Sequence, residues 1–222
     1  MAHYAPPPPS GRVAEVPDVY IANPTPLGLI ALAFGTAMLG CAFAGFIVVS
    51  YTPTSLSAVA TSMVLVLGGI VQILAGMWEF RRHHTLEATL FSAYGGFLVA
   101  FGLGFLPSFG FFTGINARFF YQVLGLSLLC WTIVSAILVV GSLRTNTVYL
   151  AMLVLMFLAF FFLTIGALAN GNGPLLAIGG WLAILCALVG WYAALVSLTS
   201  TVHALDETKL PLGRLAHGES MT

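Results

Sequence analysis

The sequence predicts an all-α integral membrane protein, a bundle of six transmembrane helices. Of the 222 residues, 59% are hydrophobic and 6% are charged, whereas about 25% of the residues of soluble domains carry a charge. The mean hydropathy of +1.02 leaves too little polar surface to cover a soluble core. The apolar runs are about 20 residues long and do not alternate with polar residues, which favours helices over a transmembrane β-barrel.

The six helices are expected between polar or proline-rich breaks, over residues 24–49, 56–80, 88–106, 117–141, 147–169 and 175–200. Together they form one transmembrane domain over residues 21–203. Residues 1–20 contain the run Pro6–Pro9 and are expected to form a flexible cytoplasmic tail. Residues 204–222 are polar and form a second cytoplasmic tail.

The first helix begins at the stretch Asn23-Pro24-Thr25-Pro26-Leu27-Gly28-Leu29. Asn23 is a favourable N-cap, and Pro24 lies where a missing N–H costs nothing. Such a helix N-terminus offers N–H donors and a partial positive charge to an anion, although the same residues suit a capped membrane helix without a ligand. Further along, Leu32 and Thr36 lie four residues apart and share one face.

In the second helix, Gly68, Gln72 and Gly76 recur every four residues and predict one stripe of the helix surface. Gln72 is the most polar side chain at mid-membrane depth, so it needs a partner on a neighbouring helix, on water or on a solute. Glu79 lies at the membrane edge beside residues 81–82, both arginines. It is interpreted as one member of an interfacial ion pair or, alternatively, as a proton site.

The third helix carries Gly96, Ala100 and Gly104, a stripe of small residues that suits close helix packing. Tyr94 precedes two glycines, so its ring either lies over bare backbone or belongs to an interfacial aromatic belt. The fifth helix is apolar all round, and Met156 within it is expected to pack. The turn at residues 170–174 leads into the sixth helix.

Basic residues predict the orientation of the bundle. With six helices both termini share one side, and that side receives Arg12, Arg81, Arg82, Arg144, Lys209 and Arg214, whereas only Arg118 falls on the other. The positive-inside rule therefore places both termini in the cytoplasm. The expected location is the cell membrane, either plasma or inner, and the lipid bilayer is an expected partner.

Several function classes are excluded by composition. The net charge is zero and there is no basic patch, which argues against nucleic acid as a partner. The cysteines Cys41, Cys130 and Cys186 are far apart and are interpreted as packing residues, and His83 and His84 as solvated loop residues. No metal or other cofactor is therefore expected.

No acidic, basic or histidine residue lies in the middle of a predicted span. A proton-relay pump would normally carry one there, and an enzyme would need a nucleophile with a base or a metal cluster. We therefore expect no enzyme. The remaining polar groups, Thr36, Gln72 and Tyr94, suit a narrow, mostly neutral path with hydrogen-bonding positions and an apolar constriction.

Three blocks of the sequence resemble signatures of the acetate uptake transporter family (GPR1/FUN34/YaaH). Residues 23–29 resemble its NPAPLGL motif, with Thr25 in place of alanine. Residues 68–80, GGIVQILAGMWEF, resemble its GG-x-x-Q-x-x-AG-x-x-E-aromatic block. Residues 91–97, FSAYGGF, resemble its F-x-SYGGFW block, with Ala93 in place of serine and Leu98 in place of tryptophan. The blocks stand in the family's order and spacing, and the resemblance covers the whole six-helix region.

The resemblance implies a succinate–acetate permease type of protein, with a pore in each protomer and six protomers in a homohexamer. It also implies an apolar constriction formed by Leu32, Tyr94 and Met156. Leu32 stands where an aromatic residue is usual, and Met156 where a leucine is usual. The family's GNTFG loop is replaced here by residues 83–87, HHTLE, so that loop's role is not carried over.

The sequence thus predicts membrane transport of acetate and related small carboxylates, with succinate as a candidate, either through a channel or with protons. Asn23, Thr36, Gln72 and Tyr94 are the expected substrate-binding residues, and Glu79 is the candidate proton site. The solute can also carry the proton itself, because acetic acid has a pKa of about 4 to 5, near that of Glu. The alternative is a channel for a small neutral solute such as urea, an amide or ammonia; a scaffold or sensor without transport is a third hypothesis.

Overall fold

The chain forms a bundle of six long apolar helices in the computed structural model, which describes residues 21–46, 60–105 and 117–206. The described helical elements are α1 (Thr25–Phe43), η1 (Val64–Val71), α3 (Gln72–Arg81), α4 (Thr85–Phe105), α5 (Ala117–Ser142), α6 (Thr147–Leu168) and α7 (Gly173–Asp206). The second membrane span, Ala60–Arg81, contains both η1 and α3. Each of the six spans is long and apolar enough to cross a membrane, which confirms the predicted fold class. The predicted N-terminal tail, residues 1–20, lies outside the described residues, as do residues 207–222 of the predicted C-terminal tail, residues 204–222. Residues 204–206 of that tail belong to α7.

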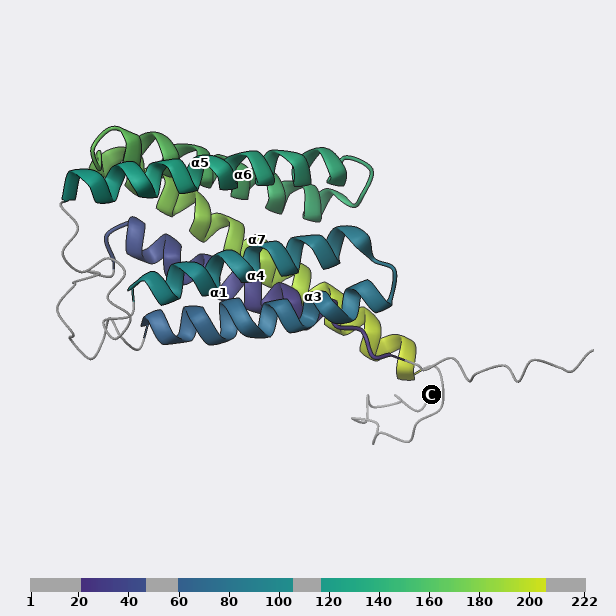
Figure 1. Cartoon of the computed structure of the whole chain (residues 1–222). Coiled ribbons are helices and arrows are strands. Elements are labelled where there is room, and N and C mark those ends of the chain that lie inside the picture. Colours follow the sequence, from purple (N-terminus) through teal and green to yellow (C-terminus); the bar gives the residue numbers. More distant parts are fainter. Residues whose placement is uncertain (1–20, 47–59, 106–116, 207–222) are drawn as a thin grey trace, which may run out of the picture.

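The helices pack as two groups joined by α7 (Figure 1). Helix α1 packs on η1 and α3, which in turn pack on α4, while α5 and α6 form a hairpin. Helix α7 runs obliquely along both α1 and α6. The start of α1, the end of α7 and the α3–α4 and α5–α6 turns all gather at one end of the bundle (Figure 1). We call this the Asn23 end.

Glycines set how closely these helices approach. A Cβ on Gly180 of α7 would lie 2.4 Å from the backbone nitrogen of Ala44, beside α1. A Cβ on Gly69 would lie 3.0 Å from the backbone nitrogen of Val99 on α4. Gly35 of α1 and Gly68 of η1 face one another in the same manner, with a Cβ on Gly68 only 3.0 Å from the Gly35 Cα. These glycines let backbones touch where larger residues would separate them.

The second span departs from a regular α-helix. Residues Val64–Val71 form a π-helix, which widens the turns just before Gln72. Gly68 lies against Gly35 on α1 and against the side chain of Leu98 on α4, whereas Gly76 lies against Ser92 on α4. Both glycines of the predicted stripe therefore contact α4, and Gly68 contacts α1 as well.

Helix α1 ends six residues before its predicted end at residue 49. Gly45 has a left-handed φ of +87°, Phe46 N–H donates to Cys41 O at 2.9 Å and Gly45 N–H donates to Ala42 O at 3.3 Å. These bonds form a Schellman motif, which closes a helix at a left-handed glycine. The sequence analysis counted this glycine within the helix, and it is the residue that ends it. Helix α7, by contrast, continues to Asp206, six residues beyond its predicted end.

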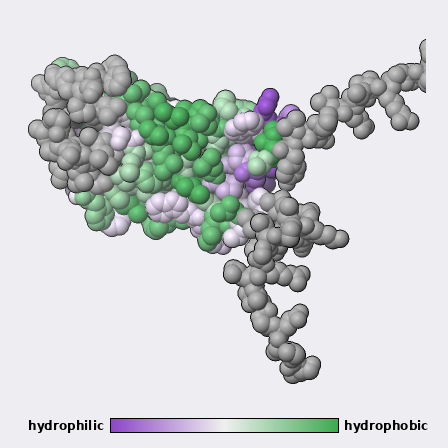
Figure 2. Space-filling view, turned by 90° about the horizontal axis from the view of Figure 1, so that it is seen from below, coloured by the Kyte–Doolittle hydropathy of each residue, from purple (hydrophilic) through white to green (hydrophobic). Residues whose placement is uncertain are grey.

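The outer surface of the bundle is apolar. Figure 2 shows hydrophobic residues across its middle and hydrophilic residues gathered at one end. On α5 the outward side chains include Phe119, Leu126, Ile137 and Val140, each more than half exposed. Of the predicted small-residue stripe on α4, Gly96 has no atom within 4 Å of an added Cβ and Ala100 is exposed. This part of the stripe faces outward rather than toward another helix of the same chain.

Candidate functional site

A narrow cavity of about 30 Å³ opens between the two helix groups. It lies among α1, α4, α5, α6 and α7, and its wall is almost entirely apolar. The lining residues are Leu32, Thr36, Leu39, Gly40, Phe43, Tyr94, Phe97, Leu98, Leu128, Met156, Phe160, Leu163 and Ala183. None of these is charged, so the cavity offers little to stabilise an ion.

The three residues of the expected constriction meet at this cavity. Leu32 of α1, Tyr94 of α4 and Met156 of α6 all line it, and each is at most 4% exposed. Along α1 the lining runs from Leu32 to Phe43, the half of the helix that lies away from Asn23. Toward the Asn23 end the interior is filled by side chains such as Leu29 and Phe91, both fully buried. The three residues therefore close the inner end of the cavity.

The ring of Phe91 also takes the space beside Gly28. A Cβ on Gly28 would lie 2.3 Å from that ring. The absence of a side chain at Gly28 therefore makes room for a side chain of α4.

The predicted polar positions do not all share one place. Thr36 is buried and lines the cavity beside Tyr94. Gln72 is fully buried but is not among the lining residues, and neither its Oε1 nor its Nε2 has a hydrogen-bond partner among the described residues. The hydroxyl of Ser92 on α4 is likewise unpartnered. A buried polar group without a partner costs about 1–3 kcal/mol, so this region between η1, α3 and α4 requires water or a solute.

Tyr94 already uses its hydroxyl within the protein. The group donates a hydrogen bond to Ser135 Oγ on α5 at 2.9 Å. Its ring stacks on Phe160 of α6, with the centroids 6.0 Å apart and the planes 15° apart. The cavity therefore meets the ring of Tyr94 at the constriction. The interfacial-belt interpretation of Tyr94 does not hold, because the side chain is 1% exposed.

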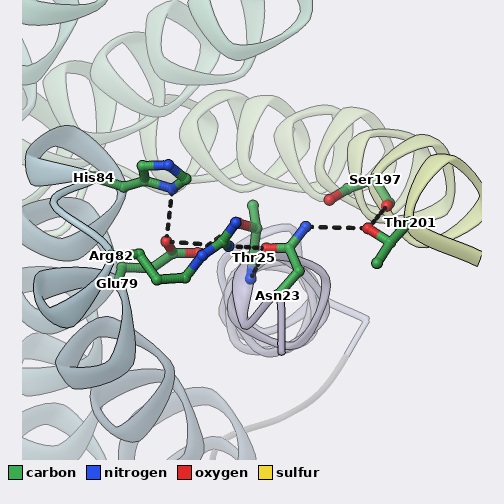
Figure 3. Close-up of polar contacts among 7 residues, drawn as sticks. All are labelled: Asn23, Thr25, Glu79, Arg82, His84, Ser197 and Thr201. Carbon is green, nitrogen blue, oxygen red and sulfur yellow. Dashed lines mark hydrogen bonds and ion pairs between the residues drawn. The ribbon is translucent and has the colours of Figure 1, made fainter. Parts of the chain in front are cut away.

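Asn23 ties three helices together at its end of the bundle (Figure 3). Its Oδ1 accepts the backbone N–H of Thr25, the first residue of α1, at 3.1 Å, and also accepts a bond from the guanidinium of Arg82. The N-cap position itself is Pro24 and not the predicted Asn23. Its Nδ2 donates to the hydroxyl of Thr201 on α7 at 3.1 Å. An anion at this helix start would therefore compete with bonds that Asn23 already makes.

Glu79 is fully buried beside these contacts of Asn23. Its Oε1 accepts a hydrogen bond from the Thr25 hydroxyl. Its Oε2 lies 2.9 Å from His84 Nδ1 and 3.8 Å from Arg82 Nη1. The ion pair proposed for Glu79 from the sequence is present with Arg82, and His84 adds a second partner. These contacts join α1 to the α3–α4 turn (Figure 3).

His84 was missed by the sequence analysis, which treated it as a solvated loop residue. His83 adopts a left-handed φ of 61°, and His84 N–H donates to Glu79 O at 3.1 Å. This is again a Schellman motif, in which the N–H of the second residue after the helix bonds to a carbonyl of the last helical turn. Here the motif brings His84 close to Glu79. The five-residue spacing between Glu79 and His84 was the signal for the contact. Among the described residues, no group of three His, Cys, Asp or Glu side chains lies close enough to hold a metal ion.

The strained position of His83 gives a first prediction. A non-glycine residue in the left-handed region costs about 1 kcal/mol relative to glycine, so His83→Gly should raise the unfolding free energy by roughly that amount. Thermal unfolding in detergent measures the change. His83→Ala removes the same imidazole but keeps a Cβ, and it should show no such gain; equal stabilisation by both variants would contradict the explanation.

Comparisons with known proteins agree with the sequence blocks. The family model described as GPR1/FUN34/yaaH family matches residues 7–211. Acetate permease A of Emericella nidulans is 34% identical over 191 residues, which cover 81% of this chain and 62% of that protein. The succinate-acetate/proton symporter SatP of Escherichia coli K12 is 28% identical over 194 residues, which cover 87% of this chain and 96% of that protein.

A solved structure shares the fold. The structure entitled "Structure of the bacterial acetate channel SatP" superimposes with a TM-score of 0.71 at 27% identity and covers 87% of this chain and 100% of that chain. The chain spans 62% of the length of acetate permease A and 63% of the length of accumulation of dyads protein 2 of Saccharomyces cerevisiae, to which it is 32% identical over 184 residues. Another relative from that yeast, ammonia transport outward protein 2, is 28% identical over 190 residues.

Proposed function

The chain belongs to the GPR1/FUN34/yaaH family, and from that premise we propose that it transports acetate and related small carboxylates through a pore in each protomer. The observation that carries the proposal is the meeting of Leu32, Tyr94 and Met156, from three different spans, at the closed end of a cavity inside one bundle. A hydrophobic constriction of this kind gates a pore by excluding water. Transport, rather than catalysis, is the activity that this arrangement supports.

The dry wall of the cavity favours passage of the uncharged acid. Moving a carboxylate from water into an apolar passage is far more costly than moving the neutral acid. Because acetic acid has a pKa of about 4 to 5, a mildly acidic compartment supplies some of the neutral form. In this proposal the solute carries its own proton across the constriction.

We further propose that hydrogen-bonding residues guide the solute on either side of the constriction. Asn23 receives the anion at the start of α1 by giving up one of its present bonds to Arg82, Thr25 or Thr201. Thr36 lies in the cavity wall, and Gln72 offers the unpartnered amide described above. Tyr94 contributes a hydroxyl only when its bond to Ser135 opens. We assign both termini to the cytoplasmic side of a plasma or inner membrane, because Arg81, Arg82 and the exposed Arg144 lie at the turns of the Asn23 end.

The assembly proposed for the chain is a homohexamer. Support comes from the large apolar faces on the outside of the bundle and from the outward-facing Gly96 and Ala100 on α4, which suit close contact with another protomer. Native mass measurement of the detergent-solubilised protein determines the number of chains.

The function is tested by flux into proteoliposomes. Labelled acetate should enter vesicles that contain the protein faster than empty vesicles, and an inward proton gradient should accelerate it. Uptake that equals the empty-vesicle rate, with and without the gradient, would overturn the proposal.

A channel for a small neutral solute is the second candidate. It is favoured by the uncharged cavity wall and by the similarity to a protein named for ammonia transport. Competition separates the two: excess acetate should slow the uptake of a labelled carboxylate through this pore, and it should leave urea or ammonia flux unchanged if the pore is built for neutral solutes.

Glu79→Gln tests which group carries the proton. Glu79 already binds three partners and does not line the cavity, so we expect acceleration of acetate uptake by a proton gradient to persist in the variant. The protein should lose about 1.5–3 kcal/mol of stability, because hydrogen bonds to a charged group disappear. Glu87→Gln, at a half-buried carboxylate in the first turn of α4, is the control. Loss of the gradient effect in Glu79→Gln alone would assign the proton to Glu79.

A further inference from the structure

The hydrogen bond between Tyr94 and Ser135 has a fixed direction. Ser135 Oγ donates its single proton to the backbone carbonyl of Trp131 at 2.7 Å, and a carbonyl oxygen accepts only. Ser135 therefore has only lone pairs left for Tyr94, whose hydroxyl donates to it at 2.9 Å. Ser135 is fully buried. The hydroxyl protons of Tyr94 and Ser135 are therefore both donated to acceptors within the protein and not to the cavity.

This bond reaches across the wall of the cavity. Tyr94 belongs to α4 and Ser135 to α5, 41 residues apart in sequence, and α4 packs far less against α5 than against η1 and α3. The ring is held on the same side by Trp131 of α5, at a centroid distance of 5.9 Å, and by Phe160 of α6. The α5–α6 hairpin therefore positions a residue of α4 at the constriction.

We propose that Ser135 is a positioning residue for the pore, acting through the hydroxyl of Tyr94. By accepting that proton it keeps the hydroxyl out of the cavity, so that the constriction formed with Leu32 and Met156 remains hydrocarbon. This inference rests on the proposed transport function and adds a determinant of selectivity to it. Polar neutral solutes are rejected because the constriction offers them no hydrogen bond.

Removing the acceptor reverses this arrangement. In Ser135→Ala the Tyr94 hydroxyl is buried without a partner, which is unfavourable. This cost is relieved when the O–H bond of Tyr94 rotates to direct its proton toward the cavity. The constriction then binds water. The expected result is a glycerol-to-acetate permeability ratio in proteoliposomes raised by about tenfold, the change that corresponds to roughly one neutral hydrogen bond.

Matched variants isolate the hydroxyl contact. Ser135→Thr keeps the accepting oxygen and should retain the wild-type ratio, while Ser135→Cys, with a weak acceptor, should be intermediate and serves if the alanine variant does not fold. Thr132→Ala removes another buried hydroxyl of α5, which bonds Leu128 O and Thr164 instead of Tyr94, and it should leave the ratio unchanged. In a Tyr94→Phe background, Ser135→Ala should have no further effect.

The inference is overturned if folded Ser135→Ala keeps the wild-type ratio, or if its effect persists in full with Tyr94→Phe. A readout that needs no transport separates this from failure of the proposed function. The ultraviolet resonance Raman difference between wild type and Tyr94→Phe reports whether the Tyr94 hydroxyl donates, and Ser135→Ala should abolish the donor signature. A donor signature without any acetate flux would overturn the proposed function alone, whereas flux without the signature would overturn the role of Ser135 alone.

Discussion

Met156→Ala is expected to raise the succinate-to-acetate permeability ratio on the order of tenfold, which corresponds to about 1.4 kcal/mol less barrier for the larger solute. Met156 lines the inner end of the cavity together with Leu32 and Tyr94 and is 4% exposed. Its truncation widens the constriction and removes hydrocarbon that excludes water. Parallel uptake of labelled succinate and acetate into proteoliposomes measures the ratio.

Two variants control for the accompanying loss of stability. Truncating a buried methionine to alanine costs about 2–5 kcal/mol. Met152, on the same helix, is equally buried at 1% exposed but does not line the cavity, so Met152→Ala should lose similar stability without changing the ratio. Met156→Leu conserves the volume and should also behave as wild type. The assignment of the constriction is wrong if Met156→Ala and Met152→Ala show the same ratio.

Gly180→Ala is expected to cause the largest loss of stability among single-methyl additions. An added Cβ would lie 2.4 Å from Ala44 N, 2.7 Å from Gly40 O and 2.8 Å from Phe43 C. All three are backbone atoms that no rotamer change can move, so α1 and α7 must separate. Overpacking of this kind costs about 1–3 kcal/mol or more, and we expect the unfolding temperature in detergent to fall by about 5–10 °C.

The matched control is Gly173→Ala at the start of the same helix, where an added Cβ meets no atom within 4 Å. This variant should unfold at the wild-type temperature or slightly above it, since alanine favours helix more than glycine does. Because Gly40 also lines the cavity, Gly180→Ala should change acetate flux as well. Equal unfolding temperatures for Gly180→Ala and Gly173→Ala would contradict the close approach of α1 and α7.

The helices themselves were predictable because each depends on local hydrophobicity and on nearby caps. The start of α1 illustrates this, since Asn23 and the Thr25 N–H that its side chain accepts are two positions apart. Resemblance to a known family supplied the grouping of Leu32, Tyr94 and Met156, which no local pattern contains. The cavity that all three line is a finding of the structure.

The contacts that were missed depend on distance in sequence or on unusual backbone. Ser135 was not singled out from the sequence, because its contact with Tyr94 joins helices whose contacting residues are 41 positions apart. The π-helix before Gln72 leaves no clear mark on the sequence, because Gly68, Gln72 and Gly76 repeat with an α-helical period. His84 contacts Glu79 only because His83 takes a left-handed conformation. Such features arise from packing and not from composition.

The π-helix also determines how the two halves of the second span are rotated against each other. Residues Val64–Val71 join a first turn at residues 60–63 to α3, and their wide turns determine how far α3 is rotated about its own axis. If these residues returned to α-helical hydrogen bonding, α3 would rotate about its axis relative to residues 60–63. That rotation would carry the Gln72 amide and the Glu79 carboxylate together away from their present neighbours, so the angular register of two distant polar groups depends on eight apolar and glycine residues.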